Sequence, residues 1–199
     1  MARLCVFCGS RTGVDPAHAR VAEALGRGLA AAGVGLVTGG GSVGLMGVVA
    51  DAALAGGGEA VGVIPRALVE REVGHARLSE MHVVETMHQR KALMATLADA
   101  FVALPGGIGT FEELFEAWTW ATLGYHAKPV ALLNSGGYYD DLVAFLDRAV
   151  GDGFLRPDAR AALHVADTPE ALLDALAPAL AAPGSSASGG SASGGSAPA

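Results

Sequence analysis

The sequence of 199 residues is poor in cysteine. It has two, Cys5 and Cys8, which form a lone C-x-x-C pair. A structural zinc site needs four ligands, and no second cysteine pair exists to complete one. The pair also overlaps an apolar, strand-like run at residues 4–7, and residues three apart on a strand point to opposite faces. We therefore predict buried strand cysteines and no metal site.

Positive charge is scarce as well. Lys and Arg together number 13 against 20 Asp and Glu, the formal net charge is −7, and no basic run occurs. Proteins bind nucleic acids through clustered Lys and Arg, so we expect no nucleic-acid partner. A small anionic ligand remains compatible with this composition, because it needs only a local positive spot.

Long apolar runs are absent. No run approaches the roughly 18 residues that a membrane-spanning helix needs, and the N-terminus lacks the apolar region and cleavage site of a signal peptide. We expect a cytoplasmic protein without a membrane segment. With 51% hydrophobic residues the chain can form one domain over residues 1–182. Residues 183–199 contain only Pro, Gly, Ser and Ala, which predicts a flexible tail.

The sequence does contain a glycine-rich loop at residues 104–113, L-P-G-G-I-G-T-F-E-E. It follows an apolar run typical of a buried strand, and a helical pattern of apolar residues begins at Thr110. Glycines let the backbone approach a ligand closely, and the unpaired N–H groups of a helix start bind anions. A strand, a glycine loop and a helix start in this order predict a phosphate site, with Glu113 in the first turn of the helix.

Two explanations of Glu113 stay open at this point. Thr110-x-x-Glu113 also matches a capping box, in which the two side chains satisfy backbone donors. A second helix start, at Thr86, favours the functional explanation, because Arg90 and Lys91 follow one turn into that helix. Cations are unfavourable near the positive end of a helix dipole, so their position suggests that they serve a bound anion.

Strands and helices alternate along the chain. The patterns predict strands at residues 3–8, 34–38, 60–64, 81–84, 100–104, 129–133 and 163–165, and helices at residues 15–32, 44–55, 86–98, from 110, 138–150 and from 168. This alternation predicts a single-domain α/β fold with a parallel sheet covered on both faces. Ligands bind at the carboxyl ends of such strands, so Arg90 and Glu113 can converge on one crevice. The polar connection at residues 66–80 is expected to form a mobile flap.

A second glycine loop, G-G-G-S-V-G at residues 39–44, satisfies the weak pattern G-x-G-x-x-G. The dinucleotide fingerprint belongs after the first strand, whereas this loop follows the second. NAD binding, with Glu59 on the ribose, is therefore the weaker interpretation, and a second loop lining the same crevice is the stronger one. The pattern G-x-x-x-x-G-K-[ST] does not occur, which excludes a P-loop NTPase.

Two tryptophans, Trp118 and Trp120, lie about 200° apart around one helix. One can join the core while the other points elsewhere. With Tyr125 and His126 at the end of the same helix, the pattern favours a partner surface over a single exposed aromatic. A symmetric dimer is the simplest hypothesis.

The stretches M-H-Q-R-K at residues 87–91 and P-G-G-I-G-T-F-E-E at residues 105–113 closely resemble motifs of the LOG family of cytokinin-activating enzymes. These are cytokinin riboside 5′-monophosphate phosphoribohydrolases, sometimes mislabelled lysine decarboxylases. The resemblance extends through residues 8–10, 39–47, 128–130 and 137–139. It covers almost everything before the tail.

The resemblance implies a Rossmann-like, doubly wound homodimer that needs no metal or organic cofactor. The implied reaction is hydrolysis of the N-glycosidic bond of N6-modified adenosine monophosphates to free base and ribose 5-phosphate. Arg90 and Glu113 resemble the catalytic pair of the family. The residues that resemble substrate contacts are Gly107, Ile108, Gly109 and Thr110 around the phosphate, Phe111 and Glu112 on the lip, and Glu72, Lys91 and Thr119.

Elementary chemistry agrees with this reading. Breaking a glycosidic bond builds positive charge on the sugar, which a carboxylate such as Glu113 stabilises, and Arg90 can offset electron density on the departing base. A pyridoxal enzyme needs a Schiff-base lysine, but only Lys91 and Lys128 exist, and Lys128 begins a strand at the edge away from the crevice. A non-catalytic nucleotide or cofactor carrier is the alternative, and an NAD(P) oxidoreductase is weaker. The preferred base and the role of the product cannot be predicted from the sequence.

Overall fold

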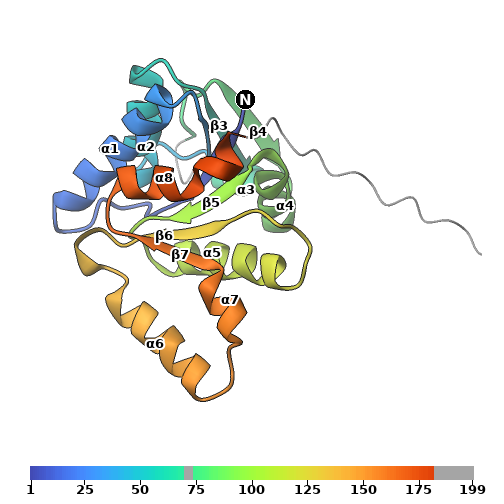
Figure 1. Cartoon of the computed structure of the whole chain (residues 1–199). Helices are drawn as coiled ribbons and strands as arrows, with labels where there is room; N and C mark the ends of the chain where they lie inside the picture. Colours follow the sequence, from blue (N-terminus) through green and yellow to red (C-terminus); the bar gives the residue numbers. More distant parts are fainter. Residues whose placement is uncertain (70–73, 182–199) are drawn as a thin grey trace, which may run out of the picture.

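The structure, a computed structural model, describes residues 1–69 and 74–181. Its centre is a seven-stranded, all-parallel sheet in the order β4-β3-β2-β1-β5-β6-β7 (Figure 1). The strands are β1 (Arg3–Phe7), β2 (Gly35–Thr38), β3 (Ala60–Pro65), β4 (Glu80–Val84), β5 (Ala100–Ala103), β6 (Val130–Leu133) and β7 (Leu163–Ala166). The predicted single-domain α/β fold with a parallel sheet is confirmed. The tail predicted at residues 183–199 lies outside the described residues.

Helices cover both faces of the sheet. They are α1 (Ala17–Ala31), α2 (Gly44–Ala55), α3 (Arg66–Val69), α4 (Met87–Leu97), α5 (Ile108–Thr122), α6 (Asp140–Gly151), α7 (Pro157–Ala161) and α8 (Pro169–Leu180), with a 3-10 turn η1 (Ser135–Gly137). The sequence patterns did not predict α3, α7 or η1, which are five residues or shorter and show no helical periodicity.

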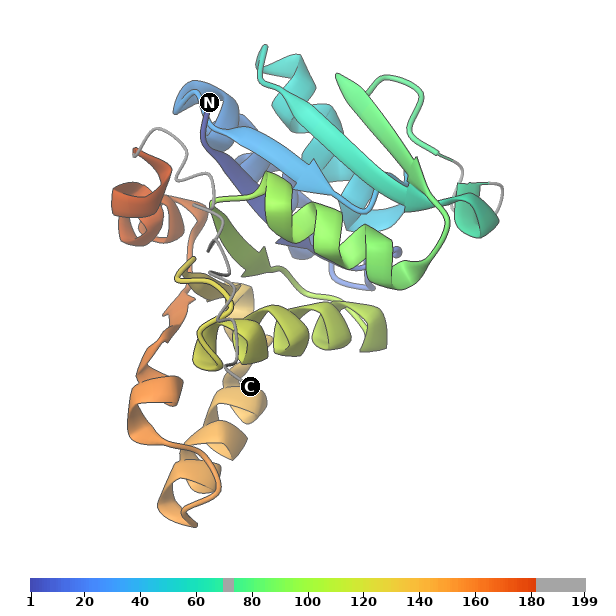
Figure 2. The ribbon, with the colours of Figure 1, turned by 90° about the vertical axis from the view of Figure 1, so that its right-hand side faces the viewer.

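Two separate apolar cores hold these layers together. One cluster packs α1, α2 and α8 on the first face of the sheet, through residues such as Leu25, Val49 and Leu172. The other packs α4, α5 and α6 on the second face, through Met94, Leu114 and Leu146. Figure 2 shows α4 and α5 running side by side on this second face. Because both faces are covered, strands such as β5 are buried at every residue, and their sequences are continuously apolar rather than alternating.

Local hydrogen bonds mark the starts of three helices. Thr86 and Gln89 form a capping box at the start of α4, where the sequence predicts a helix start. Thr168 caps α8 through its side chain and is followed by Pro169 at the first helical position. At α1 the N-cap position is Pro16, and the carboxylate of Asp15 accepts from the N–H of Ala17, the first helical residue, at 2.7 Å.

The strand order defines where a ligand can bind. The chain moves outward from β1 through β2 and β3 to the edge strand β4, then returns to place β5 on the other side of β1. The loops after β1 and β5 therefore leave the sheet in opposite directions and open a crevice between them. This is the topological switch point at which doubly wound sheets bind ligands.

The connection between β3 and β4 is tied down where the structure describes it. The N–H of His75 donates to the carbonyl of Gly40 at 2.9 Å, and its buried ring contacts the Asp51 carboxylate of α2 at 2.8 Å. The flap expected over residues 66–80 is thus wrong for residues 74–80, because these contacts bind the segment to α2 and the second glycine loop. Residues 70–73 lie outside the described residues. Among the helices of residues 1–69 and 74–181, none is long and apolar enough to cross a bilayer.

Candidate active site

A cavity of about 610 Å³ lies at the switch point. Its walls are residues 8–14 of the β1–α1 loop, the first turn of α2, residues 105–107 of the β5–α5 loop and residues 108–110 of α5. The side chains of His18, Arg90 and Tyr138 complete the lining. A volume of several hundred Å³ is typical of small-molecule sites.

Helix α5 points its N-terminus at this cavity. The helix begins at Ile108, after Gly107 in an extended conformation, and no side chain caps it. The N–H groups of its first turn have no partner within the helix and are available to an anion. The backbone before the helix is also crowded: a Cβ at Gly106 would lie 2.1 Å from Thr110 Oγ1, so only glycine fits there.

The predicted start of this helix was two residues too late. Thr110 lies inside the first turn and is buried, and Glu113 lies in the second turn rather than the first. The Thr110-x-x-Glu113 capping box does not form, because the glycine loop lets the helix begin earlier. The carboxylate of Glu113 is engaged instead by a residue from another helix.

That partner is Arg90, whose Nη1 donates to Glu113 Oε1 at 2.8 Å. Arg90 is buried, and its Nε donates to the carbonyl of Val63 at 3.1 Å. The guanidinium also presses against the second glycine loop, since a Cβ at Gly39 would lie 1.9 Å from Nη2. The prediction that the Arg90 and Glu113 side chains meet is confirmed, but of the two only Arg90 lines the large cavity. The second glycine loop contacts the guanidinium at Gly39, and Leu45 and Met46, which follow the loop, line the cavity.

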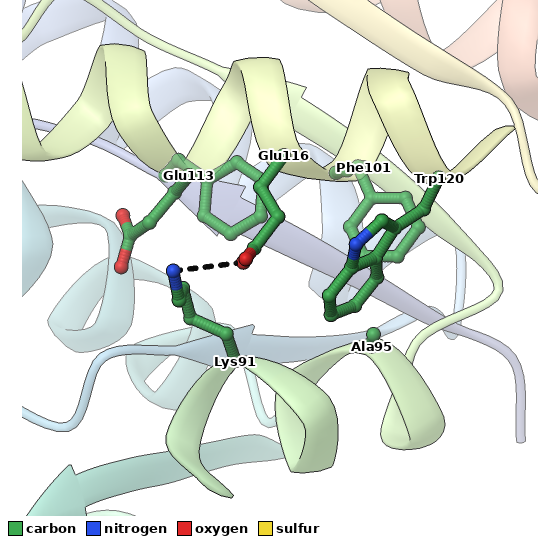
Figure 3. Close-up of a pocket in the computed structure, with 8 residues that line it drawn as sticks. Lys91, Ala95, Phe101, Glu113, Glu116 and Trp120 are labelled. Atoms are coloured by element: carbon green, nitrogen blue, oxygen red, sulfur yellow. Dashed lines mark ion pairs between the residues drawn. The ribbon is translucent and has the colours of Figure 1, made fainter. Parts of the chain in front are cut away.

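Lys91, the next residue on α4, faces carboxylates. Its Nζ pairs with Glu112 and, at 3.0 Å, with Glu116 (Figure 3). Burial lowers the pKa of Lys91, but the two carboxylates outweigh this effect and raise the pKa above its ordinary value. The cations near the start of α4 therefore pair with acidic residues of α5, and the sequence interpretation missed the partners of Lys91.

A small pocket of about 10 Å³ lies beside this ion pair. Figure 3 shows Lys91 and Ala95 of α4 on one side and Glu113, Glu116 and Trp120 of α5 on the other, with Phe101 of β5 behind them. The volume corresponds to about one water molecule. Glu113 thus lines the small pocket, and its hydrogen-bond partner Arg90 lines the large cavity.

The residues predicted for the site separate into groups. Those that line the large cavity are Arg90, Gly107, Ile108, Gly109 and Thr110. Lys91 and Glu113 line the small pocket. Phe111 was expected on the lip but turns toward the second core, where its ring packs edge-on to Tyr139 at 6.4 Å. Glu112 pairs with Lys91, Thr119 is exposed farther along α5, and Glu72 lies outside the described residues.

Several cavity residues were missed from the sequence. They come from the β1–α1 loop (Ser10, Arg11, Thr12), from α1 (His18) and from the turn after β6 (Tyr138). Only the knowledge that β1 and β5 are neighbours would have indicated them, because the carboxyl ends of adjacent parallel strands share one edge.

The remaining predictions concern the two cysteines, a metal site and Glu59. Cys5 and Cys8 are free thiols, and burial followed by the nearby Glu113 raises the pKa of Cys8, so it is no thiolate nucleophile. Among the described residues no three His, Cys, Asp or Glu side chains gather as metal ligands. Glu59, the proposed ribose contact of an NAD site, pairs with Arg3 at 2.9 Å near the amino ends of the strands, away from the cavity.

Comparison with known proteins gives a consistent result. Residues 46–176 match a family model described as "Possible lysine decarboxylase". The chain is 54% identical over 158 residues to cytokinin riboside 5′-monophosphate phosphoribohydrolase LOG7 of Arabidopsis thaliana, covering 79% of this chain and 73% of that protein. It is 50% identical over 171 residues to the phosphoribohydrolase LOG of Oryza sativa subsp. japonica, covering 86% and 71% of the two chains.

Among solved structures, the molybdenum cofactor carrier protein of Chlamydomonas reinhardtii superposes with a TM-score of 0.68. The sequences are 22% identical, and the match covers 91% of this chain and 99% of the carrier. A structural genomics target has a TM-score of 0.69 at 26% identity, covering 89% and 99%. The likeness to the carrier shows a common fold and nothing about a common ligand.

The residues do not fit the decarboxylase description of the family model. A pyridoxal-dependent enzyme needs a lysine that can form a Schiff base. Lys91 is held between two carboxylates that favour its charged form. Lys128, the other lysine of the sequence, lies before β6 at the opposite edge of the sheet, where its Nζ donates to the carbonyl of Ala95 at 2.7 Å.

Proposed function

The chain belongs to the LOG family of cytokinin riboside 5′-monophosphate phosphoribohydrolases, and from this premise we propose that it is an enzyme that hydrolyses the N-glycosidic bond of nucleoside 5′-monophosphates. The products are a free base and ribose 5-phosphate. The observation that carries the proposal is the nearly buried Arg90–Glu113 pair, joined at 2.8 Å beside the N-terminus of α5.

The phosphate binds at the start of α5. Gly107, Ile108 and Gly109 offer backbone N–H groups to the ligand, and the backbone there is open, since a Cβ at Gly107 or Gly109 would meet no protein atom within 4 Å. Thr110 lies at the same helix end and lines the cavity. With the phosphate held there, the sugar lies within the same cavity, whose wall includes Arg90.

The reaction needs charge stabilisation on both sides of one bond. As the bond from C1′ to the base nitrogen breaks, its electron pair leaves with the base and positive charge grows on the sugar. Glu113 stabilises that charge or takes a proton from the attacking water, and the cationic guanidinium of Arg90 offsets the charge on the departing base. The hydroxyl of the water ends on C1′ and its proton ends on the base, so atoms and charge balance.

Three finer assignments complete the proposal. The substrate is an adenosine monophosphate, with or without an N6 substituent, as the family name implies. The protein acts as a homodimer in the cytoplasm, and exposed apolar side chains at the end of α5, Leu123 and Tyr125, offer a surface for the partner subunit. Four further residues stay predicted substrate contacts: Lys91, Glu112, Thr119 and Glu72.

The test is base release from purified protein. AMP and its N6-isopentenyl analogue are supplied separately, and free base and ribose 5-phosphate are measured. Glu113→Gln should keep nucleotide binding and lower kcat by about 10²- to 10³-fold, because the carboxylate charge acts mainly in the transition state. Glu170→Gln is the matched control: the same change, made in the exposed first turn of α8.

Two outcomes would count against the proposal. A wild-type protein that binds both nucleotides and releases no base would be a carrier. A Glu113→Gln variant with more than about a tenth of the wild-type kcat would remove Glu113 from the chemistry.

A further inference from the structure

The turn after β6 lies directly against the β5–α5 loop, which precedes the proposed phosphate site. Strand β6 pairs in parallel with β5, so the segments that leave their carboxyl ends are neighbours. The turn contains the sequence G-G-Y-Y at residues 136–139, which neither the reaction nor the sheet explains. Tyr138 lines the large cavity, whereas Tyr139 is buried beneath it.

The backbone of this turn directs both tyrosine side chains toward the β5–α5 loop. Gly136 and Gly137 have φ values of 65° and 74°, a left-handed conformation that side chains rarely adopt. Asn134 then fixes the reversal: its Oδ1 accepts from the N–H of Tyr139 at 2.7 Å, and its Nδ2 donates to Asp140 at 2.8 Å. Consecutive tyrosines would normally point apart, and this turn directs both toward the β5–α5 loop.

Each tyrosine hydroxyl donates to a carbonyl of that loop. Tyr139 donates to the carbonyl of Leu104 at 2.6 Å, and Tyr138 donates to the carbonyl of Gly106 at 2.5 Å. The rings pack edge-on at 4.9 Å, which couples the two positions. Burial raises the pKa of Tyr139 above its ordinary value, so the phenol keeps the proton that it donates.

The carbonyl of Pro105, which lies between these two acceptors in the chain, also accepts a hydrogen bond. Pro105 accepts from the N–H of Gly9 at 3.1 Å. All three carbonyls of residues 104–106 therefore point at donors from other elements. A carbonyl oxygen that turned into the cavity would repel a phosphate, whereas the N–H groups at the start of α5 attract it.

We propose that Tyr138 and Tyr139, the tyrosine pair, are positioning residues of the phosphate site: their hydroxyls hold the carbonyls of Leu104 and Gly106 away from the cavity, so that the loop presents N–H groups to a phosphate monoester. The inference rests on the proposed function, which places the phosphate at the start of α5. The tyrosine pair acts through the loop and takes no part in bond cleavage.

The test separates phosphate binding from chemistry. Tyr138→Phe removes one hydroxyl and keeps the ring. It should weaken binding of ribose 5-phosphate about 3- to 10-fold, the value of one neutral hydrogen bond, and raise the KM for AMP by a similar factor with kcat within about twofold. Binding of adenosine, which has no phosphate, should stay unchanged. Thr96→Val is the control and should change none of these values, because it also removes an exposed hydroxyl that donates to a backbone carbonyl, that of Ala92 within α4, at 2.9 Å.

A merely structural tyrosine would give a different pattern. Unchanged affinity of Tyr138→Phe for ribose 5-phosphate, or equal weakening of ribose 5-phosphate and adenosine, would overturn the proposal. Tyr139→Phe should weaken phosphate binding too, but it also lowers the Tm because the residue is buried, so Tyr138→Phe decides the question.

Binding of ribose 5-phosphate can be measured without catalysis, so the tyrosine proposal and the proposed reaction can fail independently. Wild-type protein that binds ribose 5-phosphate but releases no base would refute the reaction and leave the tyrosine test intact. Wild-type protein that does not bind ribose 5-phosphate would overturn both.

Discussion

Replacing Gly39 by alanine adds a single methyl group next to Arg90 and removes no functional group. The new Cβ would lie 1.9 Å from Arg90 Nη2 and 3.1 Å from Cζ. Gly39 is not in the left-handed region, so the backbone itself accepts alanine. The guanidinium must therefore retreat by about 1.5 Å to reach ordinary van der Waals distance.

A shift of that size cannot preserve both hydrogen bonds of Arg90. The side chain is fixed by bonds of 2.8 Å to Glu113 and 3.1 Å to the carbonyl of Val63, and it is buried, so it has little room to adapt. Loss of one charge-assisted hydrogen bond costs about 1.5–3 kcal/mol. If the lost geometry is needed in the transition state, kcat/KM should fall about 10- to 150-fold.

The assay is steady-state base release from AMP or its N6-isopentenyl analogue, together with the Tm of each protein. Gly151→Ala is the control, because a Cβ there meets nothing within 4 Å and the residue ends α6, far along the chain from Arg90. Gly39→Ala should lose activity while remaining folded. A kcat/KM within twofold of wild type would refute the idea that the position of the Arg90 guanidinium sets the rate.

Two further predictions concern stability. Gly109→Ala should raise the Tm by up to about 2–4 °C, since alanine favours the helix by up to about 1 kcal/mol. The variant should also raise the KM, because its methyl group enters the cavity. Thermal unfolding and steady-state kinetics measure the two effects, and an unchanged KM would contradict the phosphate site. The bidentate hydrogen bond from Arg3 keeps the pKa of Glu59 below its ordinary value despite partial burial. This pair therefore stabilises the fold fully above about pH 4.3, where an unfolded glutamate titrates, and the contribution is lost as the pH falls through the lower folded pKa. Glu59→Gln should lower the Tm at pH 7 by about 2–4 °C, which corresponds to about 1 kcal/mol. The Tm difference from wild type should disappear below about pH 4. A Tm difference that does not depend on pH would contradict a stabilising Arg3–Glu59 ion pair.

The parts of the fold that follow from local chemistry could be predicted from the sequence. Buried parallel strands are continuously apolar, and the capping box at Thr86 is a contact between residues three apart. The convergence of Arg90 and Glu113 could be predicted for a similar reason, because both follow strand ends and all carboxyl ends of a parallel sheet share one edge.

The start of α5 shows where local rules fail. Thr110-x-x-Glu113 satisfies the capping-box pattern, but the pattern does not reveal that Glu113 has a stronger partner 23 residues away. A charge-assisted, nearly buried contact outweighs a local side-chain bond to the backbone. The partners of Lys91 were missed for the same reason, since the spacing of α4 and α5 depends on the core beneath them.

The turn after β6 could not be predicted at all. Its role depends on which strand lies beside β5, and sequence patterns give the order of strands along the chain but not across the sheet. The hydroxyl groups of Tyr138 and Tyr139 meet their acceptors only after β5 and β6 have paired.

The ion pairs between α4 and α5 bear on how a nucleotide reaches the cavity. Arg90 and Lys91 are paired with the carboxylates Glu112, Glu113 and Glu116, and Arg11 adds one positive charge to the cavity lining, in a protein whose net charge is −7. The surroundings of the site are close to neutral, so little long-range attraction draws a dianion from solution. Capture then depends on contacts made at close range, and the encounter rate should respond only weakly to ionic strength.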